Sequence, residues 1–223
     1  MGRLRGCFVT GTDTGVGKTV VAACLVAALA ARGEGVAAFK PAVTGLDEPP
    51  SVGWPHDHVL LASLTGQSPE EVAPYRFGPA ASPHLAGTVD RSTVVAAARA
   101  TADAAEVVVI EGVGGLLVPL TAGWSIRDFA CEMGLPLVVV ARPGLGTINH
   151  TLLTLEAARA VELHVAAVVL TPWPAEPDAI ELSNRETIAG AGVQVATVPR
   201  LPDAGRDELA RAGARLPLDR WLG

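Results

Sequence analysis

Short apolar runs alternate along the chain with longer stretches in which apolar and polar residues are mixed. The apolar runs are continuous, which is typical of strands buried on both faces, and the mixed stretches between them are typical of helices. This alternation predicts an α/β fold, a doubly wound and mainly parallel sheet in a single domain over residues 1–223. The predicted strands are 6–10, 36–40, 106–110, 135–141, 165–170 and 193–198, and the predicted helices are 17–31, 92–105 and 147–161.

Residues 45–89 interrupt this alternation with many prolines, several glycines and a group of histidines. Long excursions of this kind in α/β proteins tend to carry function. We expect a partly helical segment over the carboxyl ends of the strands, where such folds bind ligands. A second proline-rich loop, 172–177, follows the strand that ends at Leu170 and is expected at the same edge.

Composition narrows the class of protein. Hydrophobic residues make up 49% and charged residues 18%, as in globular chains. The net charge of -6 and the lack of a lysine or arginine cluster argue against a nucleic-acid partner. The apolar runs are too short or too interrupted for a signal peptide or a membrane span, so we expect a cytoplasmic protein without a membrane partner. Cys7, Cys24 and Cys131 fit no metal spacing and are predicted to be buried free thiols.

The most specific motif is the segment GTDTGVGKT, Gly11 to Thr19, between a predicted strand and a predicted helix. Glycines let backbone N–H groups surround phosphate oxygens, and the helix start adds favourable partial charge. Lys18 is expected to reach the β- and γ-phosphates and Thr19 to ligate Mg²⁺. A glycine-rich turn without a ligand is the alternative, which Gly-Lys-Thr at such a junction disfavours. The expected nucleotide contacts here are Gly15, Val16, Gly17, Lys18, Thr19 and Val20.

The spacing of this loop indicates which class of nucleotide-binding protein the chain resembles. Five residues, not four, separate Gly11 from Gly17. This resembles the deviant phosphate loops of the superfamily that holds dethiobiotin synthetases, partitioning ATPases and cobyrinate amidases. The dimeric partitioning and septum-site ATPases carry a signature lysine four residues before the Gly-Lys pair. Asp13 stands at that position here, which argues against the motor-like ATPases.

Further motifs resemble the dethiobiotin synthetase family, in the family's order and over most of the chain before its last third. The first motif comprises residues 8–14 and 16–19, and the second comprises residues 39–41 and 44–45. The other three are residues 82–84, 111–115 and 146–150. The resemblance implies an enzyme that uses Mg²⁺ and ATP to carboxylate 7,8-diaminononanoate (diaminopelargonate) with CO₂ and to close a cyclic urea. It also implies that Lys18, Lys40 and Thr14 act in catalysis.

Two strand ends carry charged residues that suit this chemistry. Lys40 precedes Pro41 and is predicted to point from the carboxyl edge of the sheet, where it can stabilise a transferring phosphoryl group. A surface lysine is the alternative. Glu111 follows the run 107–110, where P-loop hydrolases hold a Mg²⁺ carboxylate. The glycines after it let the chain approach the triphosphate, and the expected contacts there are Gly112, Val113 and Gly114.

Asp57 lies between His56 and His58, which raises the question of a transition-metal site. No further histidine or cysteine with ligand spacing follows, so the pattern does not favour one. The resemblance instead makes Asp57 a second Mg²⁺ carboxylate, beside Thr19 and Glu111, at the start of a helix that reaches Leu64. A helix-capping aspartate is the alternative.

The start of the helix after the strand 135–141 offers free N–H groups that can bind a carboxylate. Capping by Thr147 is the alternative. In the family this helix start comes from the partner subunit, so the resemblance implies a homodimer with a shared site. The substrate-binding residues it implies are Thr14, Lys40, Thr44, Ser82, Gly114, Leu145, Gly146, Thr147 and Asn149.

The last third departs from the family. An Asn-Asp pair often follows the strand that ends here at Leu170, and its asparagine contacts adenine, but this chain has Thr171 and Pro172. The residues Pro199, Arg200 and Leu201 resemble the second base-contacting loop. We therefore expect nucleotide contacts from both segments and a loose choice of base, with other nucleoside triphosphates replacing ATP.

The sequence disfavours two other functions. A nucleotide-switch ATPase acting on a protein partner would be favoured by a signature lysine or an exposed amphipathic tail, and the sequence has neither. A glutamine-dependent amidase would need a Cys-His amidotransferase domain, for which 223 residues leave no room.

Overall fold

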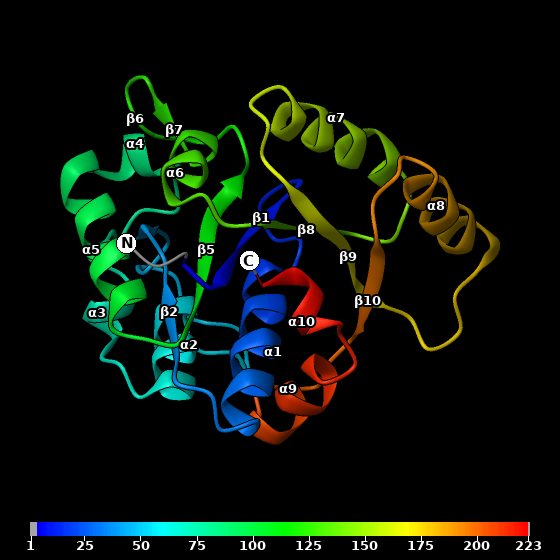
Figure 1. Ribbon diagram of the computed structural model, residues 1–223, viewed down its shortest axis with the longest axis horizontal. Coiled ribbons are helices and arrows are strands. Elements are labelled where there is room, and N and C mark those ends of the chain that lie inside the picture. Colours follow the sequence, from blue (N-terminus) through cyan, green and yellow to red (C-terminus); the bar gives the residue numbers. More distant parts are fainter. Residues whose placement is uncertain (1–3, 223) are drawn as a thin grey trace.

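A computed structural model describes residues 4–222, and its centre is a sheet of six parallel strands in the order β10-β9-β8-β1-β5-β2 (Figure 1). Residues 1–3 and 223, which the predicted domain 1–223 also included, lie outside the described residues. The strand order places the chain's change of direction at β1, where α/β folds bind ligands. The strands are β1 (Gly6–Gly11), β2 (Val36–Phe39), β5 (Val107–Gly115), β8 (Leu137–Ala141), β9 (Val165–Trp173) and β10 (Val195–Pro199).

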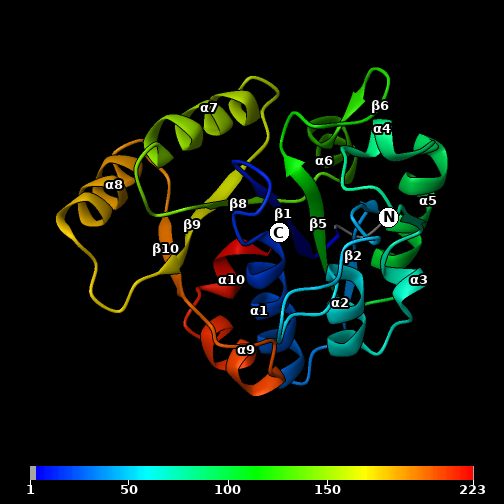
Figure 2. The ribbon, with the colours of Figure 1, turned by 180° about the vertical axis from the view of Figure 1, so that it is seen from behind.

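Helices cover both faces of this sheet (Figures 1 and 2). One face packs against α1 (Lys18–Ala31), α2 (Asp57–Thr65), α9 (Arg206–Gly213) and α10 (Leu218–Trp221). The other packs against α5 (Arg91–Asp103), α6 (Ile126–Met133), α7 (Thr147–Arg159) and α8 (Ala179–Ala189). This arrangement confirms the predicted doubly wound α/β fold. Smaller elements are α3 (Pro69–Val72), α4 (Pro83–Ala86) and the strand pairs β3 (Ala42–Val43) with β4 (Tyr75–Arg76) and β6 (Pro119–Thr121) with β7 (Trp124–Ser125).

The two-faced burial explains the continuous apolar runs. Along β1, Cys7 and Val9 belong to the core beneath α1, whereas Phe8 belongs to the core beneath α6. The Phe8 ring meets Phe129 of α6 edge to face, with 5.5 Å between the ring centroids. Such a ring pair adds about 1 kcal/mol beyond the area it buries. Successive residues of a central strand therefore face one apolar core and then the other.

Helix α1 lies between α2 and α9 as well as against the sheet (Figure 2). Its residues 21–29 are all buried, so it is apolar on nearly every face. Its backbone comes very near Gly213 of α9, where an added Cβ would lie 2.0 Å from the carbonyl oxygen of Cys24. Only glycine allows the two helices to approach this closely.

Strand β2 lies at one edge of the sheet, and the connection from α2 to α3 runs along it. The Ala38 N–H donates to Oε1 of Gln67 at 2.8 Å. The Lys40 N–H, just after β2, donates to the carbonyl oxygen of Val72 at 2.8 Å. Backbone donors on this edge are therefore bonded within the chain, and the backbone of Lys40 is fixed.

The excursion 45–89 contains β4 and the helices α2, α3 and α4. Its residues 51–57 lie at the carboxyl edge of the sheet, where an excursion over the strand ends was expected. Helix α2 then runs alongside α1 and packs against β2, because its leucines contribute to the core. The excursion therefore both borders the carboxyl edge and covers part of one face.

Two strands are longer than the sequence predicted. Strand β5 continues past Ile110 to Gly115 because β1 reaches Gly11, and these two glycines pair. Glu111 is therefore inside the strand and not at its end. Strand β9 likewise continues past Leu170 to Trp173, which pairs with Pro199 of β10.

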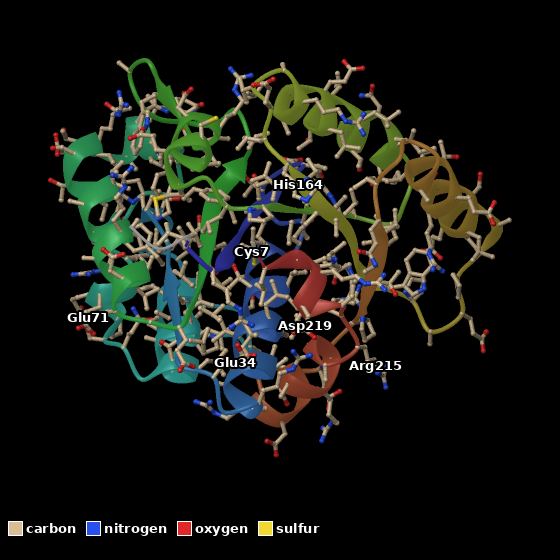
Figure 3. All side chains as sticks on the ribbon, in the orientation of Figure 1. Cys7, Glu34, Glu71, His164, Arg215 and Asp219 are labelled. Carbon is tan, nitrogen blue, oxygen red and sulfur yellow. The ribbon has the colours of Figure 1, made fainter. Side chains whose placement is uncertain are left out.

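The three cysteines are free thiols, and the expectation that all are buried is wrong for one of them. Cys7, in the interior of the molecule (Figure 3), and Cys24 are buried, and burial raises the pKa of each thiol to about 12. Cys131 on α6 is exposed, because its short helix turns only one side to the sheet. No helix within residues 4–222 has the length and apolar character needed to cross a membrane.

Candidate active site

One cavity of about 620 Å³ lies at the carboxyl ends of β1, β2, β5, β9 and β10. A larger cleft of about 850 Å³ lies at the opposite edge of the sheet, between Gly33 and Glu106, away from every predicted site residue. The smaller cavity is therefore the candidate active site. The predicted residues that line it are Thr14, Gly15, Val16, Gly17, Lys18, Thr19, Val20, Lys40, Thr44, Asp57, Glu111, Val113, Gly114, Thr171, Pro172, Pro199, Arg200 and Leu201.

The loop 12–17 joins β1 to α1 and forms the floor of the cavity. Gly17 is the N-cap of α1 with a φ of 97°, and no side chain caps this helix, so its first N–H groups are available to an anion. Nζ of Lys18 lies 2.8 Å from the carbonyl oxygen of Asp13. A Cβ on Gly17 would lie 2.7 Å from Cγ2 of Thr171, so the loop and the end of β9 are in direct contact.

A buried charge cluster forms one end of the cavity. Nζ of Lys40 donates to Asp57 and, at 2.6 Å, to Oε1 of Glu111. Thr19 donates its hydroxyl to the same Oε1 at 2.8 Å. The side chains of Lys40 and Glu111 are 4% and 0% exposed, so Lys40 is not a surface lysine and Glu111 does not face solvent.

Burial and mutual contact shift the pKa values of these groups. The pKa of Lys18 is lowered to about 8, first by burial and then by Lys40. Burial also lowers the pKa of Lys40, but Asp57 and Glu111 outweigh it and the pKa is raised. Burial raises the pKa of Glu111 in spite of Lys40, whereas for Asp57 the attraction of Lys40 outweighs burial and the pKa is lowered. Lys40 is therefore a cation over the ordinary pH range, whereas Lys18 loses its charge near pH 8.

The residues present fit Mg²⁺. Oε2 of Glu111 is buried and has no hydrogen-bond partner among the described residues, which is unusual for a carboxylate and leaves it open to a cation. Thr19 and Asp57 add two oxygen donors beside it. Mg²⁺ in nucleotide enzymes is held by one or two carboxylates together with phosphate oxygens and water.

Two alternatives for this region, a transition-metal site at His56 and His58 and a helix-capping role for Asp57, do not match the geometry. Within residues 4–222, no three side chains of His, Cys, Asp or Glu lie close enough together to hold a metal ion. His56 and His58 are therefore not part of such a group. Asp57 is the first residue of α2 and not its cap, because His56 holds the N-cap position and no side chain caps the helix. The Asp57 carboxylate faces Lys40 instead.

The other predicted residues lie outside this cavity. Gly112 faces the core, where its Cβ position lies 3.0 Å from Ile126. Ser82 is the N-cap of α4, with its hydroxyl 3.0 Å from Nδ1 of His84. Leu145 and Thr147 line a neighbouring cavity of about 490 Å³, which shares Pro172 and Arg200 with the first.

Gly146 is the N-cap of α7, with a φ of 89°, and no side-chain bond caps this helix. The capping alternative for Thr147 is therefore not observed, and its hydroxyl lies 3.5 Å from that of Thr151 instead. Asn149 lies exposed in the first turn, and Leu145 is 94% exposed. The helix start thus presents both free N–H groups and apolar surface outward.

The structure adds residues that the sequence reasoning missed. Ser51, Trp54 and Pro55 line the cavity, and the only signal for them was their place just before Asp57. Arg142 follows β8 and donates to the carboxylate of Asp13 at 2.9 Å. Asp13, at the place of the signature lysine, thus ties the phosphate loop to the end of β8.

The fold, the loop and the charge cluster together define a P-loop nucleoside triphosphate-dependent protein. A family model described as an AAA domain matches residues 5–207. Among solved structures, a ParA family ATPase from Chlorobium tepidum TLS aligns with a TM-score of 0.57 and 14% identity over 95% of this chain and 91% of its own. A chain of the MinC:MinD complex from Aquifex aeolicus aligns with 0.59 and 12% over 97% and 93%. These likenesses concern the fold alone.

Within that class, the chain belongs to the family of ATP-dependent dethiobiotin synthetases, which confirms the resemblance seen in its motifs. A relative from Anaeromyxobacter dehalogenans (strain 2CP-1) is 46% identical over 212 residues, which is 91% of this chain and 93% of the relative. One from Mycobacterium sp. (strain KMS) is 39% identical over 86% of each chain. One from Haloferax mediterranei is 37% identical over 96% of this chain and 92% of its own. All three bear the name dethiobiotin synthetase.

Proposed function

We propose that this protein catalyses the ATP-dependent carboxylation and ring closure of 7,8-diaminononanoate, which gives dethiobiotin, ADP and phosphate in biotin biosynthesis. The observation that carries the proposal is the pair Lys18 and Lys40 in one cavity with the phosphate loop and Glu111. Membership of the dethiobiotin synthetase family over more than nine tenths of the chain supports it.

The reaction has three steps. One amine of the substrate adds to CO₂ and loses a proton, which forms a carbamate. A carbamate oxygen attacks the γ-phosphorus, ADP leaves, and a carbamic-phosphoric anhydride results. The second amine attacks the carbonyl carbon, loses a proton and expels phosphate, which closes the five-membered urea. No covalent bond to the protein is needed, so the protein contributes positioning and charge stabilisation.

The residues of the cavity divide these tasks. Lys18 and Lys40 neutralise the charge that builds on the transferring phosphoryl group. Lys40 is held for this by two carboxylates, which keep it protonated and limit its freedom. Thr14 and Thr44 hydrogen-bond the amine and carbamate end of the substrate. The backbone of residues 15–20 and 113–114 surrounds the phosphates.

Mg²⁺ would be held by Thr19, Asp57 and Glu111, beside the phosphate loop. When bound, it neutralises phosphate charge and orients the triphosphate. The buried, unbonded Oε2 of Glu111 favours this assignment, since burial raises the pKa of that carboxyl and a cation would stabilise its ionised form.

The test is a phosphate-release assay with Mg-ATP, the diamine and bicarbonate. Release is expected only when diamine and bicarbonate are both present, and mass spectrometry should find the cyclic urea. The alternative, a nucleotide-switch ATPase acting on a protein partner, is not favoured by the named relatives. Hydrolysis of ATP alone at the same rate as with diamine and bicarbonate would favour this alternative.

The proposed active form is a homodimer in the cytoplasm. The exposed start of α7, with free N–H groups near Gly146, suits the substrate's carboxylate when it is supplied to the site of a partner subunit. The three cysteines are free, which suits a reducing compartment.

A further inference from the structure

The cavity has two chemically different ends. Lys40, Asp57 and Glu111 form the charged end described above. At the other end, Val20 of α1 meets the ends of β9 and β10, where Thr171 and Leu201 line the wall. A triphosphate on the loop with its terminal phosphate at the charged end places its base at this second end. Trp54 lines the same cavity.

Trp54 is held by the chain before any ligand arrives. Its side chain is half-buried and packs on the core beneath α1, as Val20 and Ala204 also do. A turn fixes its backbone, since the Trp54 N–H donates to the carbonyl oxygen of Ser51 at 2.9 Å. The Ala204 N–H donates to the carbonyl oxygen of Gly53 at 3.0 Å, which ties this turn to the loop after β10.

Among the described residues, no side chain that lines the base end is an amide, and Arg200 there can only donate hydrogen bonds. The Thr171 methyl group faces Gly17, and the proline that follows has no N–H group. Pro199 lacks that donor as well. Recognition of a base edge needs side chains that both donate and accept. An aromatic face needs no such match, because every base has a π-face on which stacking is worth a similar amount.

We propose that Trp54 is the surface against which the nucleotide base stacks, and that it supplies affinity without selecting the base. The proposal rests on the nucleotide site of the proposed function and goes beyond the family's phosphate and substrate contacts. Trp54 is only three residues before Asp57, so a base docked on the indole also steadies the segment that carries the Mg²⁺ carboxylate.

Binding of Mg-ADP, measured without turnover, tests this contact separately from the overall reaction. Tryptophan fluorescence is expected to be quenched by Mg-ADP in the wild type and in Trp173→Phe, and not in Trp54→Phe. Trp173 is the matched control, since it is half-buried near the same strand end but lines the neighbouring cavity. Quenching that survives in Trp54→Phe and disappears in Trp173→Phe would overturn the proposal. If Mg-ADP quenches but no cyclic urea forms, the proposed function fails and this inference stands.

Steady-state kinetics supply the second arm. Trp54→Ala is expected to raise KM for ATP, CTP, GTP and UTP by a similar factor, roughly five- to a hundredfold. Trp54→Phe should keep most of the affinity. A change confined to one nucleotide would show that Trp54 selects the base.

A ligand without a base separates stacking from a structural role. Inorganic tripolyphosphate should inhibit wild type and Trp54→Ala with equal inhibition constants, because it never reaches the indole. If Trp54 only supports the segment that ends at Asp57, the variant would bind tripolyphosphate less tightly and kcat would fall with ATP saturating. That outcome would refute the stacking role.

Discussion

Lys40 is a buried lysine between two carboxylates, and its Nζ is the cation that holds them together. Removing it leaves Glu111 and Asp57 as close like charges without the cation to which both are bonded. Lys40→Ala and Lys18→Ala are each expected to lower kcat on the order of a hundredfold or more, with a smaller change in KM for the diamine, because both charges matter most during phosphoryl transfer. Steady-state kinetics with folding checked by circular dichroism measure this. Turnover of Lys40→Ala near the wild-type value would show that Lys40 does not act in catalysis.

The lowered pKa of Lys18 predicts a pH dependence for nucleotide binding. Below pH 8 the Lys18 ammonium is protonated and attracts phosphate, and above its pKa of about 8 it becomes neutral in the free protein. The Kd for Mg-ADP should therefore rise as pH increases from 7 to 10, as calorimetric titration can show. Bound phosphate favours the protonated form of Lys18. The fall of kcat at alkaline pH, measured at saturating nucleotide, should therefore occur at a higher pH than the rise of Kd. A flat Kd over this range would contradict the assignment.

Thr171 predicts a loose choice of base. Its side chain carries one hydroxyl and no amide, so the position offers no amide fork to the adenine edge. Discrimination depends on buried polar groups that a wrong ligand leaves unpaired, and one such hydrogen bond is worth about 1 kcal/mol. The kcat/KM values for CTP, GTP and UTP should lie within roughly tenfold of that for ATP at saturating diamine. A preference for ATP above about a thousandfold would mean that another group reads adenine.

Some site residues could be predicted because they occupy positions that the topology itself defines. Lys18 follows the first strand in a loop with a strict pattern, and Lys40 and Glu111 belong to strands that end at the same edge. Trp54 and Arg142 could not be predicted, since their contacts join segments distant in sequence. Arg142 meets Asp13 only because β8 pairs with β1.

At the scale of elements, the packing of α9 on α1 depends on one residue. Gly213→Ala would bring its Cβ against the carbonyl oxygen of Cys24, which belongs to helix backbone and cannot move away. We expect a loss of about 1–3 kcal/mol in the free energy of unfolding, measured by urea denaturation. Gly190→Ala is the control, because its φ of -61° suits any residue and no contact there is closer than 3.3 Å. Equal stability of the two variants would contradict the close packing.

The sequence predicted the apolar strands and the long helices that connect them. The six strands are continuous apolar runs, and α1, α5 and α7 follow or precede them with regular spacing. It did not predict α6, α8, α9 or α10, which are short or largely polar on their outer faces. The length of β5 was also missed, because pairing with Gly11 and not local propensity carries that strand through its glycines.

At the scale of the whole molecule, an exposed apolar surface accompanies the site. Leu145 is 94% exposed, and Leu117 and Leu153 are each 57% exposed beside the phosphate loop. Patches of this kind mark interfaces. We expect a homodimer, with a mass near twice 22.8 kDa by light scattering. Leu153→Glu should weaken the dimer and lower activity, whereas Ile180→Glu, exposed on α8, should leave the mass unchanged. A fully active monomer would contradict the shared site.

The bonded edge at β2 has a consequence for how the protein behaves when it is crowded. An exposed strand edge with unpaired N–H and C=O groups can pair with a strand of another molecule, which is one route to aggregation. Here the Gln67 amide and the Val72 carbonyl accept the N–H groups of Ala38 and Lys40, so a foreign strand finds these donors already engaged. The same chain segment that holds the backbone of Lys40 in place thus also closes this border of the sheet to cross-β growth.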